Sequence, residues 1–245
     1  WTSICSGSSR SNAPTGRFVT VMDDKVVISH LASDARKVQW SDLDDSEDWT
    51  TGSSGSQVFP DAGTVMGFFA HARIVIMERG LRRITSTGDI TSFSFDELTS
   101  EKGTIAPWSC VETSDRLYYL APDGFYVVNG NMAEPVNISN NRISNYFYDL
   151  VNNARISQVQ GTYDPFNPRV VWAYPTGDTE HNDHNLIFDW SLSSEIGPFG
   201  RWSEAVFDSL VIARIATAGI TLENLNIASI DVAGLASFDG RAYMG

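Results

Sequence analysis

Acidic side chains crowd one short segment of the sequence, and a tryptophan stands on each side of it. The carboxylates fall within the seven residues 42–48 and belong to Asp42, Asp44, Asp45, Glu47 and Asp48, with Trp40 and Trp49 as the flanking tryptophans. This density of carboxylates suits a calcium loop, a pair of catalytic acids, or a solvated corner whose side chains bond to the backbone.

The first two alternatives fit the spacing poorly. A calcium loop of the EF-hand kind needs a glycine at its sixth position and a glutamate at its twelfth, and a loop that starts at Asp42 has Glu47 and Ser53 there. A glycosidase pair needs two carboxylates about 5 to 9 Å apart, one of them in an apolar pocket. Carboxylates on a polar corner stay ionised. An opportunistic cation site at Asp42–Asp48 remains an alternative.

We favour a structural role for the acidic segment. The sequence around Trp40, Ser41 and Asp42 predicts a strand whose tryptophan packs between neighbouring sheets. Asp44 or Ser46 is then expected to cap a short helical turn that leads to Trp49.

A second polar cluster occupies residues 176–185. It contains His181 and His184 together with Asp178, Glu180 and Asp183. These side chains resemble a metal set, but the segment joins two apolar runs, so we expect the solvated tip of a long hairpin. A metal at the two histidines remains the alternative.

No motif of a known catalytic or nucleotide-binding type occurs in the sequence, and we predict no enzyme activity and no cofactor. His30 and His71 fall at predicted strand ends or turns, where ordinary surface histidines are common. The tryptophans, including Trp108, Trp172 and Trp202, suit either sugar stacking or core packing, and we favour core packing because most lie in apolar runs.

The amino-acid composition indicates the fold class of the chain that carries these polar clusters. Hydrophobic residues make up 42% of the 245 residues and charged residues 19%, and polar turn residues recur between short runs of Val, Ile, Phe and Tyr. This composition is typical of an all-β chain. The formal net charge of −13 argues against a surface that binds phosphates non-specifically. The densest basic cluster in the sequence contains only Arg79, Arg82 and Arg83.

Two cysteines, Cys5 and Cys110, are too few for a disulfide framework, so we expect two buried free thiols. No apolar run reaches the roughly 18 residues that span a bilayer, and we expect no membrane insertion. The sequence opens at Trp1 and stops in what reads as half a hairpin. We therefore take it to be an excerpt from a longer protein.

One pattern repeats along the chain: an apolar strand, a tight polar turn, a basic residue and a second apolar strand. The basic residues are Lys25, Arg73, Arg116, Arg169 and Arg241, at separations of 48, 43, 53 and 72 residues. The first three separations match the roughly 40 to 50 residues of a propeller blade. The sequence therefore predicts a β-propeller of four-stranded antiparallel blades.

One segment, 140–153, is predicted to be helical, because Ile143, Tyr146, Phe147 and Leu150 fall at helical spacing. We expect this short helix to seal a junction between blades. The predicted division of the chain is a lead-in at 1–16, blades at 17–62, 63–103 and 104–139, a helical connector at 140–154, a blade at 155–207, and an insertion with the start of a further blade at 208–245.

Several stretches resemble the β-propeller proteins of short-tailed phage tails, namely the tail nozzle proteins (tail tubular protein B) and the related packaged-DNA stabilisation proteins. The resemblance covers about residues 16–206. Its most telling pieces are the WSD at 40–42 with the DW at Asp48 and Trp49, the GTIAPWS at 103–109, and the DGFYVVNG that starts with Asp123 and Gly124.

The resemblance implies a virion structural protein, located in the tail, that forms a homo-oligomeric ring of six copies around the DNA exit channel. Such a ring retains the genome and then passes it during ejection, and it contacts the tail adaptor and tail fibre proteins. The negative charge fits a channel through which DNA slides without sequence-specific binding. The alternative is a monomeric propeller that binds or cleaves carbohydrate near its central axis.

Overall fold

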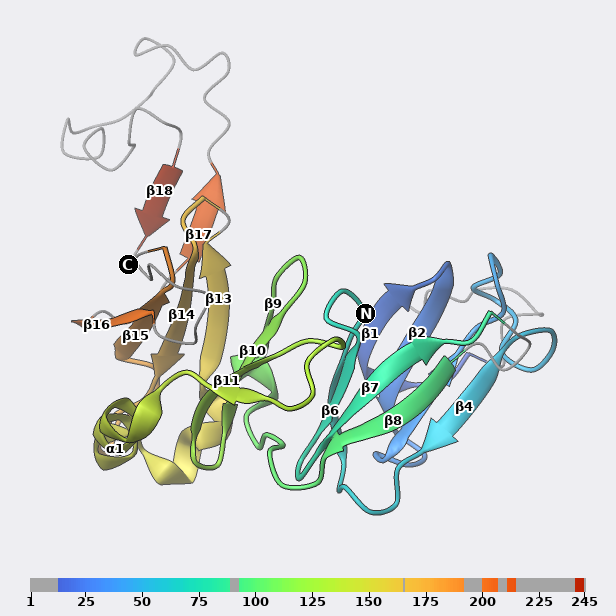
Figure 1. Cartoon of the computed structure of the whole chain (residues 1–245), viewed down its shortest axis with the longest axis horizontal. Helices are drawn as coiled ribbons and strands as arrows, with labels where there is room; N and C mark the ends of the chain where they lie inside the picture. The colour runs from blue at the N-terminus through green and yellow to red at the C-terminus, as the bar shows by residue number, and fades with distance from the viewer. Residues whose placement is uncertain are drawn as a thin grey trace, which may run out of the picture.

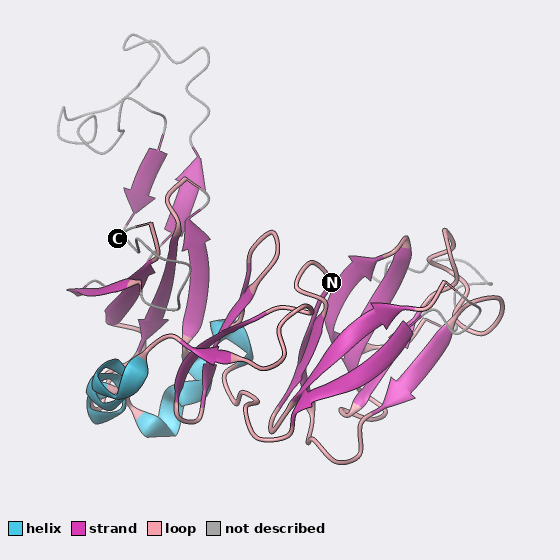
Figure 2. Ribbon diagram, in the orientation of Figure 1, coloured by secondary structure: helices cyan, strands magenta, loops and turns pink. Residues whose placement is uncertain are grey.

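The computed structural model describes residues 13–88, 93–164, 166–191, 200–206, 211–214 and 241–244. Within these residues the chain forms four antiparallel sheets of four strands and one pair of strands. The sheets follow one another along the molecule in chain order, and three short helical segments lie among them (Figures 1 and 2). The expectation of an all-β chain with a short helix is confirmed.

Each four-stranded sheet is a meander, in which every strand pairs with the next one along the chain. The first sheet contains β1 (Gly16–Met22), β2 (Lys25–Leu31), β3 (Lys37–Trp40) and β4 (Gly55–Val58). The second contains β5 (Val65–Phe69), β6 (Ile74–Met77), β7 (Leu81–Ser86) and β8 (Phe93–Thr99).

The third and fourth sheets repeat this order. The third contains β9 (Val111–Glu112), β10 (Leu117–Ala121), β11 (Gly124–Val128) and β12 (Val136–Asn137). The fourth contains β13 (Gln160–Asp164), β14 (Arg169–Tyr174), β15 (His184–Asp189) and β16 (Arg201–Val206). The last pair is β17 (Val211–Arg214) and β18 (Arg241–Met244), which are antiparallel.

Tight turns fix the register of these meanders. Met22 pairs with Lys25, so only Asp23 and Asp24 form the turn between β1 and β2. Both have positive φ, 49° and 57°. That backbone matches the right-handed twist of a two-residue hairpin, and aspartate tolerates it better than most residues.

Consecutive sheets share buried cores because the central strands are apolar on both faces. Along β6, Val75 and Met77 join the core between the first and second sheets, while Ile74 and Ile76 join the core between the second and third. This alternation explains why β6 reads as an unbroken apolar run.

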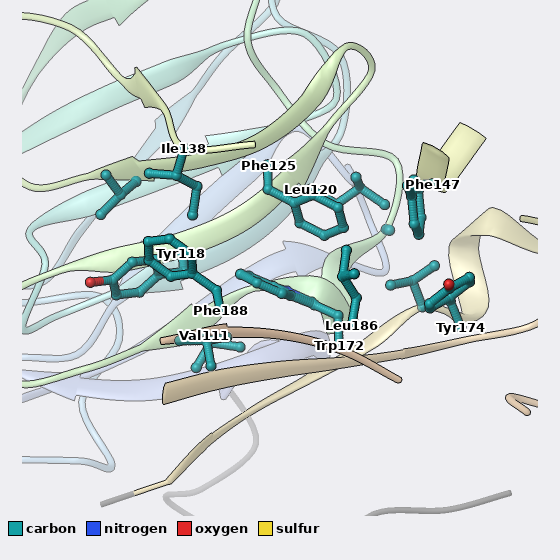
Figure 3. Close-up of a cluster of buried hydrophobic side chains, with 14 of the residues drawn as sticks. Val111, Tyr118, Leu120, Phe125, Ile138, Phe147, Trp172, Tyr174, Leu186 and Phe188 are labelled. Atoms are coloured by element: carbon teal, nitrogen blue, oxygen red, sulfur yellow. The ribbon is translucent and has the colours of Figure 1, made fainter. Parts of the chain in front are cut away.

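The third core lies between the third and fourth sheets. Side chains from β10 and β11 point toward those of β14 and β15, and Trp172 lies between the two layers, with its ring 4.6 Å from that of Phe125 (Figure 3). Trp172 is fully buried, and its indole nitrogen donates to the carbonyl oxygen of Ser109 at 2.9 Å.

The helix α1 (Asn140–Leu150) joins the third sheet to the fourth and closes one side of this core with Phe147, which is fully buried. Ile143 and Leu150 pack partly buried beside it. Tyr146 is the exception in the predicted apolar stripe, since it remains 40% exposed. Two 3-10 turns, η1 (Pro107–Ser109) and η2 (Asn153–Gln158), precede β9 and β13.

The sheets fall inside the predicted blade ranges, except that β1 begins at Gly16. The predicted lead-in at 1–16 and the insertion at 208–245 lie largely outside the described residues, as does Cys5. Cys110 is a free cysteine that packs partly buried against the core between the second and third sheets, and burial raises the pKa of its thiol, so the expectation of a buried free thiol is confirmed there. No helix in the described ranges is long and apolar enough to cross a membrane.

Candidate functional site

The acidic corner is held together by Asp42. Its carboxylate accepts hydrogen bonds from the backbone N–H of Ser53 at 2.7 Å, the Ser53 hydroxyl at 2.6 Å and the backbone N–H of Leu43 at 2.8 Å. The Ser53 hydroxyl and these backbone donors hold the pKa of Asp42 below its ordinary value. Asp42 therefore ties together two ends of the loop between β3 and β4.

Asp48 caps a second turn of the same loop. It accepts from the backbone N–H groups of Thr50 and Thr51, both at 2.9 Å, and from the Thr51 hydroxyl. These bonds, with the Thr51 hydroxyl first, lower the pKa of Asp48 to about 2. Because hydrogen bonds to the charged form stabilise it, Asp48 remains a carboxylate throughout the physiological range.

Both flanking tryptophans are buried and anchor this loop. The Trp40 indole nitrogen donates to the Ser53 carbonyl at 3.2 Å, and that of Trp49 donates to the Ser46 carbonyl at 3.0 Å. Trp40 also packs edge to face on Phe93 of the second sheet, with ring centres 5.2 Å apart. The prediction that Trp40 packs between sheets is confirmed.

The predicted capping residues are wrong. Asp42, Asp45 and Asp48 supply the caps instead. Asp45 accepts from the backbone N–H two residues later, Asp48 accepts from the one three residues later, and Asp42 accepts from the N–H of Ser53 across the loop. Residues 41–50 form turns around an isolated β-bridge between Asp42 and Asp45. The predicted helical turn does not form there.

Ser41 and Lys25 complete the corner from its buried side. The Ser41 hydroxyl oxygen accepts from the Val26 N–H at 3.0 Å, and the Lys25 ammonium group donates to the Ser53 carbonyl and hydroxyl oxygens. In the described ranges no group of three or more His, Cys, Asp or Glu side chains lies close enough together to hold a metal ion.

The basic residues of the repeat occupy equivalent places. Lys25 and Arg169 open the second strand of their sheets, and Arg73 and Arg116 immediately precede it. Arg73 has φ of 56° and lies 3.7 Å from Asp23, so it links the turns of the first and second sheets. Arg169 binds Asp189 at 2.6 Å within the fourth sheet, and Arg116 lies 3.5 Å from Asp115.

Pro122 and Asp123 form the turn between β10 and β11, and Gly124 opens β11. Asp123 accepts from the Lys102 ammonium group at 2.5 Å and from the Tyr126 hydroxyl at 2.8 Å. Gly124 has φ of 147°, and a Cβ atom there would lie 2.5 Å from the hydroxyl oxygens of both Ser139 and Ser144. Only glycine fits this first position of β11.

The two histidines of the 176–185 segment have different neighbours. His184 opens β15 with its Nδ1 3.4 Å from Asp183 and 3.3 Å from the Thr176 hydroxyl. His181 lies in the loop between β14 and β15 and lines a separate pocket. The segment is a hairpin connection, as its position between apolar runs predicts.

That separate pocket lies where the start of β1 meets the start of β13, and we call it the Trp108 pocket. Its volume is about 500 Å³. It is lined by Arg17, Trp108, Ser157, Gln158, Gln160, His181 and Asn182. The residues come from β1, from η1 and η2, from β13 and from the loop before β15. The first and fourth sheets therefore approach one another here.

Trp108 is half-exposed, at 50%, so core packing is the wrong expectation for this tryptophan. Its ring packs edge to face on Phe18 at 5.8 Å, and the Arg17 guanidinium lies 5.6 Å from its centre. Sequence reasoning missed this site because its residues come from distant segments. One signal was available: Trp108 follows Pro107 in a connection and lies outside any apolar strand run.

A second pocket, of about 770 Å³, lies between α1 and β16. There the hydroxyls of Tyr146 and Tyr174 both donate to the carboxylate of Glu204. Burial, and then the nearby Glu204 charge, raise the pKa of Tyr174. This arrangement holds the helix against the edge strand of the fourth sheet.

The fold and these sites define a class: an all-β protein of successive four-stranded meanders with a tryptophan-lined pocket between the first and last of them. No protein-family model matches the chain, and no curated protein matches it either.

Proposed function

We propose that this chain is part of a β-propeller in a phage tail nozzle protein, a virion structural protein of the tail. In this proposal copies of the protein, six in number, form a ring around the DNA exit channel. The ring retains the genome and then passes it during ejection. Tail adaptor and tail fibre proteins contact the ring, and the DNA passes without sequence-specific binding.

One observation carries the proposal: four like meanders pack in sequence, and the first and fourth line the same pocket. Sheets that stack face to face and curve back on the first one are the geometry of propeller blades. The residues on which the resemblance to phage tail proteins rests support the proposal as well, because Trp40, Asp42 and Asp48 stabilise the first sheet and the loop between β3 and β4.

An open sheet face indicates where further structure is needed. Val19 and Val21 of β1 are 69% and 64% exposed, whereas Met22 at the end of the same strand is buried in the core between the first and second sheets. Val19 and Val21 lie two residues apart and therefore share one face of the sheet, and apolar side chains that share an exposed face commonly mark an interaction surface. In a closed propeller the last blade covers this face of the first blade.

The alternative, a monomeric propeller that binds or cleaves carbohydrate, has one favourable observation in the half-exposed Trp108. Cleavage requires a pair of carboxylates in the cleft, and none of the residues that line the Trp108 pocket, all within the described ranges, is acidic. Binding without cleavage is compatible with the ring.

The test is the oligomeric mass of the intact protein, measured by native mass spectrometry and by electron microscopy. A six-copy ring with a central bore supports the proposal. A protein that stays monomeric at high micromolar concentration contradicts it. Antibodies against α1 provide an independent readout, since they are expected to label the tail of the virion.

A further inference from the structure

We propose that the Trp108 pocket binds a saccharide that carries a carboxylate, such as a uronic acid residue of a surface polysaccharide. This binding goes beyond the structural role proposed above and does not depend on it. The proposal rests on an exposed aromatic ring, a guanidinium that has no carboxylate partner among the described residues, and hydrogen-bonding groups that converge on one pocket.

The aromatic ring comes first. Trp108 lines the pocket and is half-exposed, while Phe18 and Arg17 pack against its ring from β1. A pyranose ring has an apolar face of C–H bonds with partial positive charge, and this face packs on the negative face of an indole. A fixed, half-exposed tryptophan therefore suits a sugar ring.

The charge in the pocket selects the kind of sugar. Arg17 stacks on aromatic rings, and among the described residues it has no carboxylate partner, although the chain contains 30 Asp and Glu. The nearby Glu180 already pairs with Arg155 at 2.9 Å. A guanidinium that is free to bind two oxygens suits one carboxylate of a ligand.

The neutral groups in the pocket match the hydroxyls of a sugar. Gln160, Ser157 and Asn182 offer amide and hydroxyl groups, and His181 adds an imidazole. The Asn182 side-chain oxygen is buried and has no donor in the described structure, while its nitrogen donates to the Gln158 carbonyl at 3.2 Å. A buried acceptor without a partner is costly, and a ligand hydroxyl would supply the missing donor.

A nucleotide fits the same pocket less well. A phosphate group carries more charge than one arginine neutralises, and it offers no proton to the Asn182 oxygen at neutral pH. The net charge of −13 also repels a polynucleotide. One carboxylate with several hydroxyls is the better match to one arginine and several neutral groups.

The test compares two ligands that differ only at C6: methyl β-D-glucuronide carries a carboxylate there, and methyl β-D-glucoside carries a neutral hydroxymethyl group. Binding to the whole chain is followed by the indole N–H signal of Trp108 in NMR spectra and by calorimetry. We expect the glucuronide to shift that signal and to bind at least about tenfold more tightly than the glucoside.

Three variants assign the roles. Trp108→Ala is expected to abolish binding of both glycosides, while Arg17→Gln lowers the affinity for the glucuronide to that for the glucoside. Arg36→Gln removes the same charge from an exposed loop, where Arg36 pairs with Asp34, and is the matched control with unchanged binding. Circular dichroism checks that each variant is folded.

Several outcomes overturn the proposal. One is an unchanged Trp108 signal at about 20 mM glucuronide, and another is equal affinity for the two glycosides. Inorganic phosphate that competes at equal concentration would indicate a simple anion site. Thymidine monophosphate that binds more tightly than the glucuronide would indicate a nucleotide site.

Discussion

At the scale of single residues, the acidic corner uses its charges to hold a loop. Asp48 accepts from four donors of Thr50 and Thr51, and Asp42 accepts from three donors of Leu43 and Ser53. Both carboxylates thus satisfy backbone groups that turns leave unpaired. Ionised oxygens make stronger hydrogen-bond acceptors than neutral ones, so the stability of this loop depends on pH.

Asp48 provides the first prediction. Its pKa is lowered from 3.8 to about 2 in the folded chain, so the stability that it contributes is full above about pH 4 and is lost as the pH falls toward 2. In Asp48→Asn the oxygen still accepts hydrogen bonds but binds no proton. Urea unfolding between pH 2 and 5 is expected to depend less steeply on pH in this variant.

Asp44→Asn is the matched control, because the Asp44 carboxylate accepts no hydrogen bond in the described ranges and its backbone φ of 56° suits asparagine. Its pH dependence should equal that of the unchanged chain. If Asp48→Asn also keeps the full pH dependence, Asp48 does not cap this loop as an ion.

Gly124 provides the second prediction. In Gly124→Ala the new Cβ meets two hydroxyl oxygens at 2.5 Å and the backbone is strained at φ of 147°. We expect the free energy of unfolding to fall by about 2 to 4 kcal/mol. Gly177→Ala separates the two causes, since Gly177 has φ of 53° but no atom within 4 Å of the added Cβ.

Gly177→Ala is expected to cost about 1 kcal/mol, from strain alone. The measurement is equilibrium denaturation of both variants. Equal losses for the two would mean that the contacts with Ser139 and Ser144 have no effect on stability.

At the scale of elements, the sheets are joined by side chains as well as by shared cores. Glu112 of β9 accepts hydrogen bonds from the backbone N–H groups of His71 and Ala72, at 2.8 and 2.9 Å. These amides lie in the turn between β5 and β6. A third-sheet side chain therefore orders a turn of the second sheet.

Glu112 provides the third prediction, measured by amide hydrogen exchange. Glu112→Ala is expected to raise the exchange rates of the His71 and Ala72 amides about tenfold, because both lose their acceptor. Glu112→Gln keeps a carbonyl oxygen and should retain most of the protection. Unchanged exchange in the alanine variant would mean that this link between sheets does not form in solution.

At the scale of the whole molecule, the net charge bears on the proposed passage of DNA through a ring of these chains. With 17 basic and 30 acidic residues the chain has no excess of cations to displace counterions from a duplex. The basic residues of the repeat are also partly neutralised, Arg73 by Asp23 and Arg169 by Asp189. In the proposed ring, we therefore expect chains of this charge to attract passing DNA only weakly.

This charge provides the fourth prediction. A fluorescent duplex of about 30 base pairs is expected to show no binding to the protein in about 100 mM salt, and none of the steep salt dependence of phosphate contacts. Fluorescence anisotropy is the measurement. Micromolar affinity that falls steeply with salt would contradict the weak attraction expected of the proposed channel and would indicate that basic residues line its wall.

The sequence alone determined the class of fold and its repeat. Apolar runs, tight turns and a regularly placed basic residue are local features, and they predicted four meanders, the short helix and the packing of Trp40. The structural role of the acidic corner was also predicted correctly. Its capping residues were not, because a cap depends on which backbone N–H groups the folded loop leaves without a backbone partner.

Only the tertiary structure decided which distant residues meet. Arg17, Trp108 and His181 are separated by 91 and 73 residues, and no local pattern relates them. They form one pocket because the sheets stack in order and bring the start of β1 beside the start of β13. Trp108 is exposed because of the way the sheets are arranged around this pocket. Packing between sheets sets that arrangement, and the alternation of side chains within a strand does not.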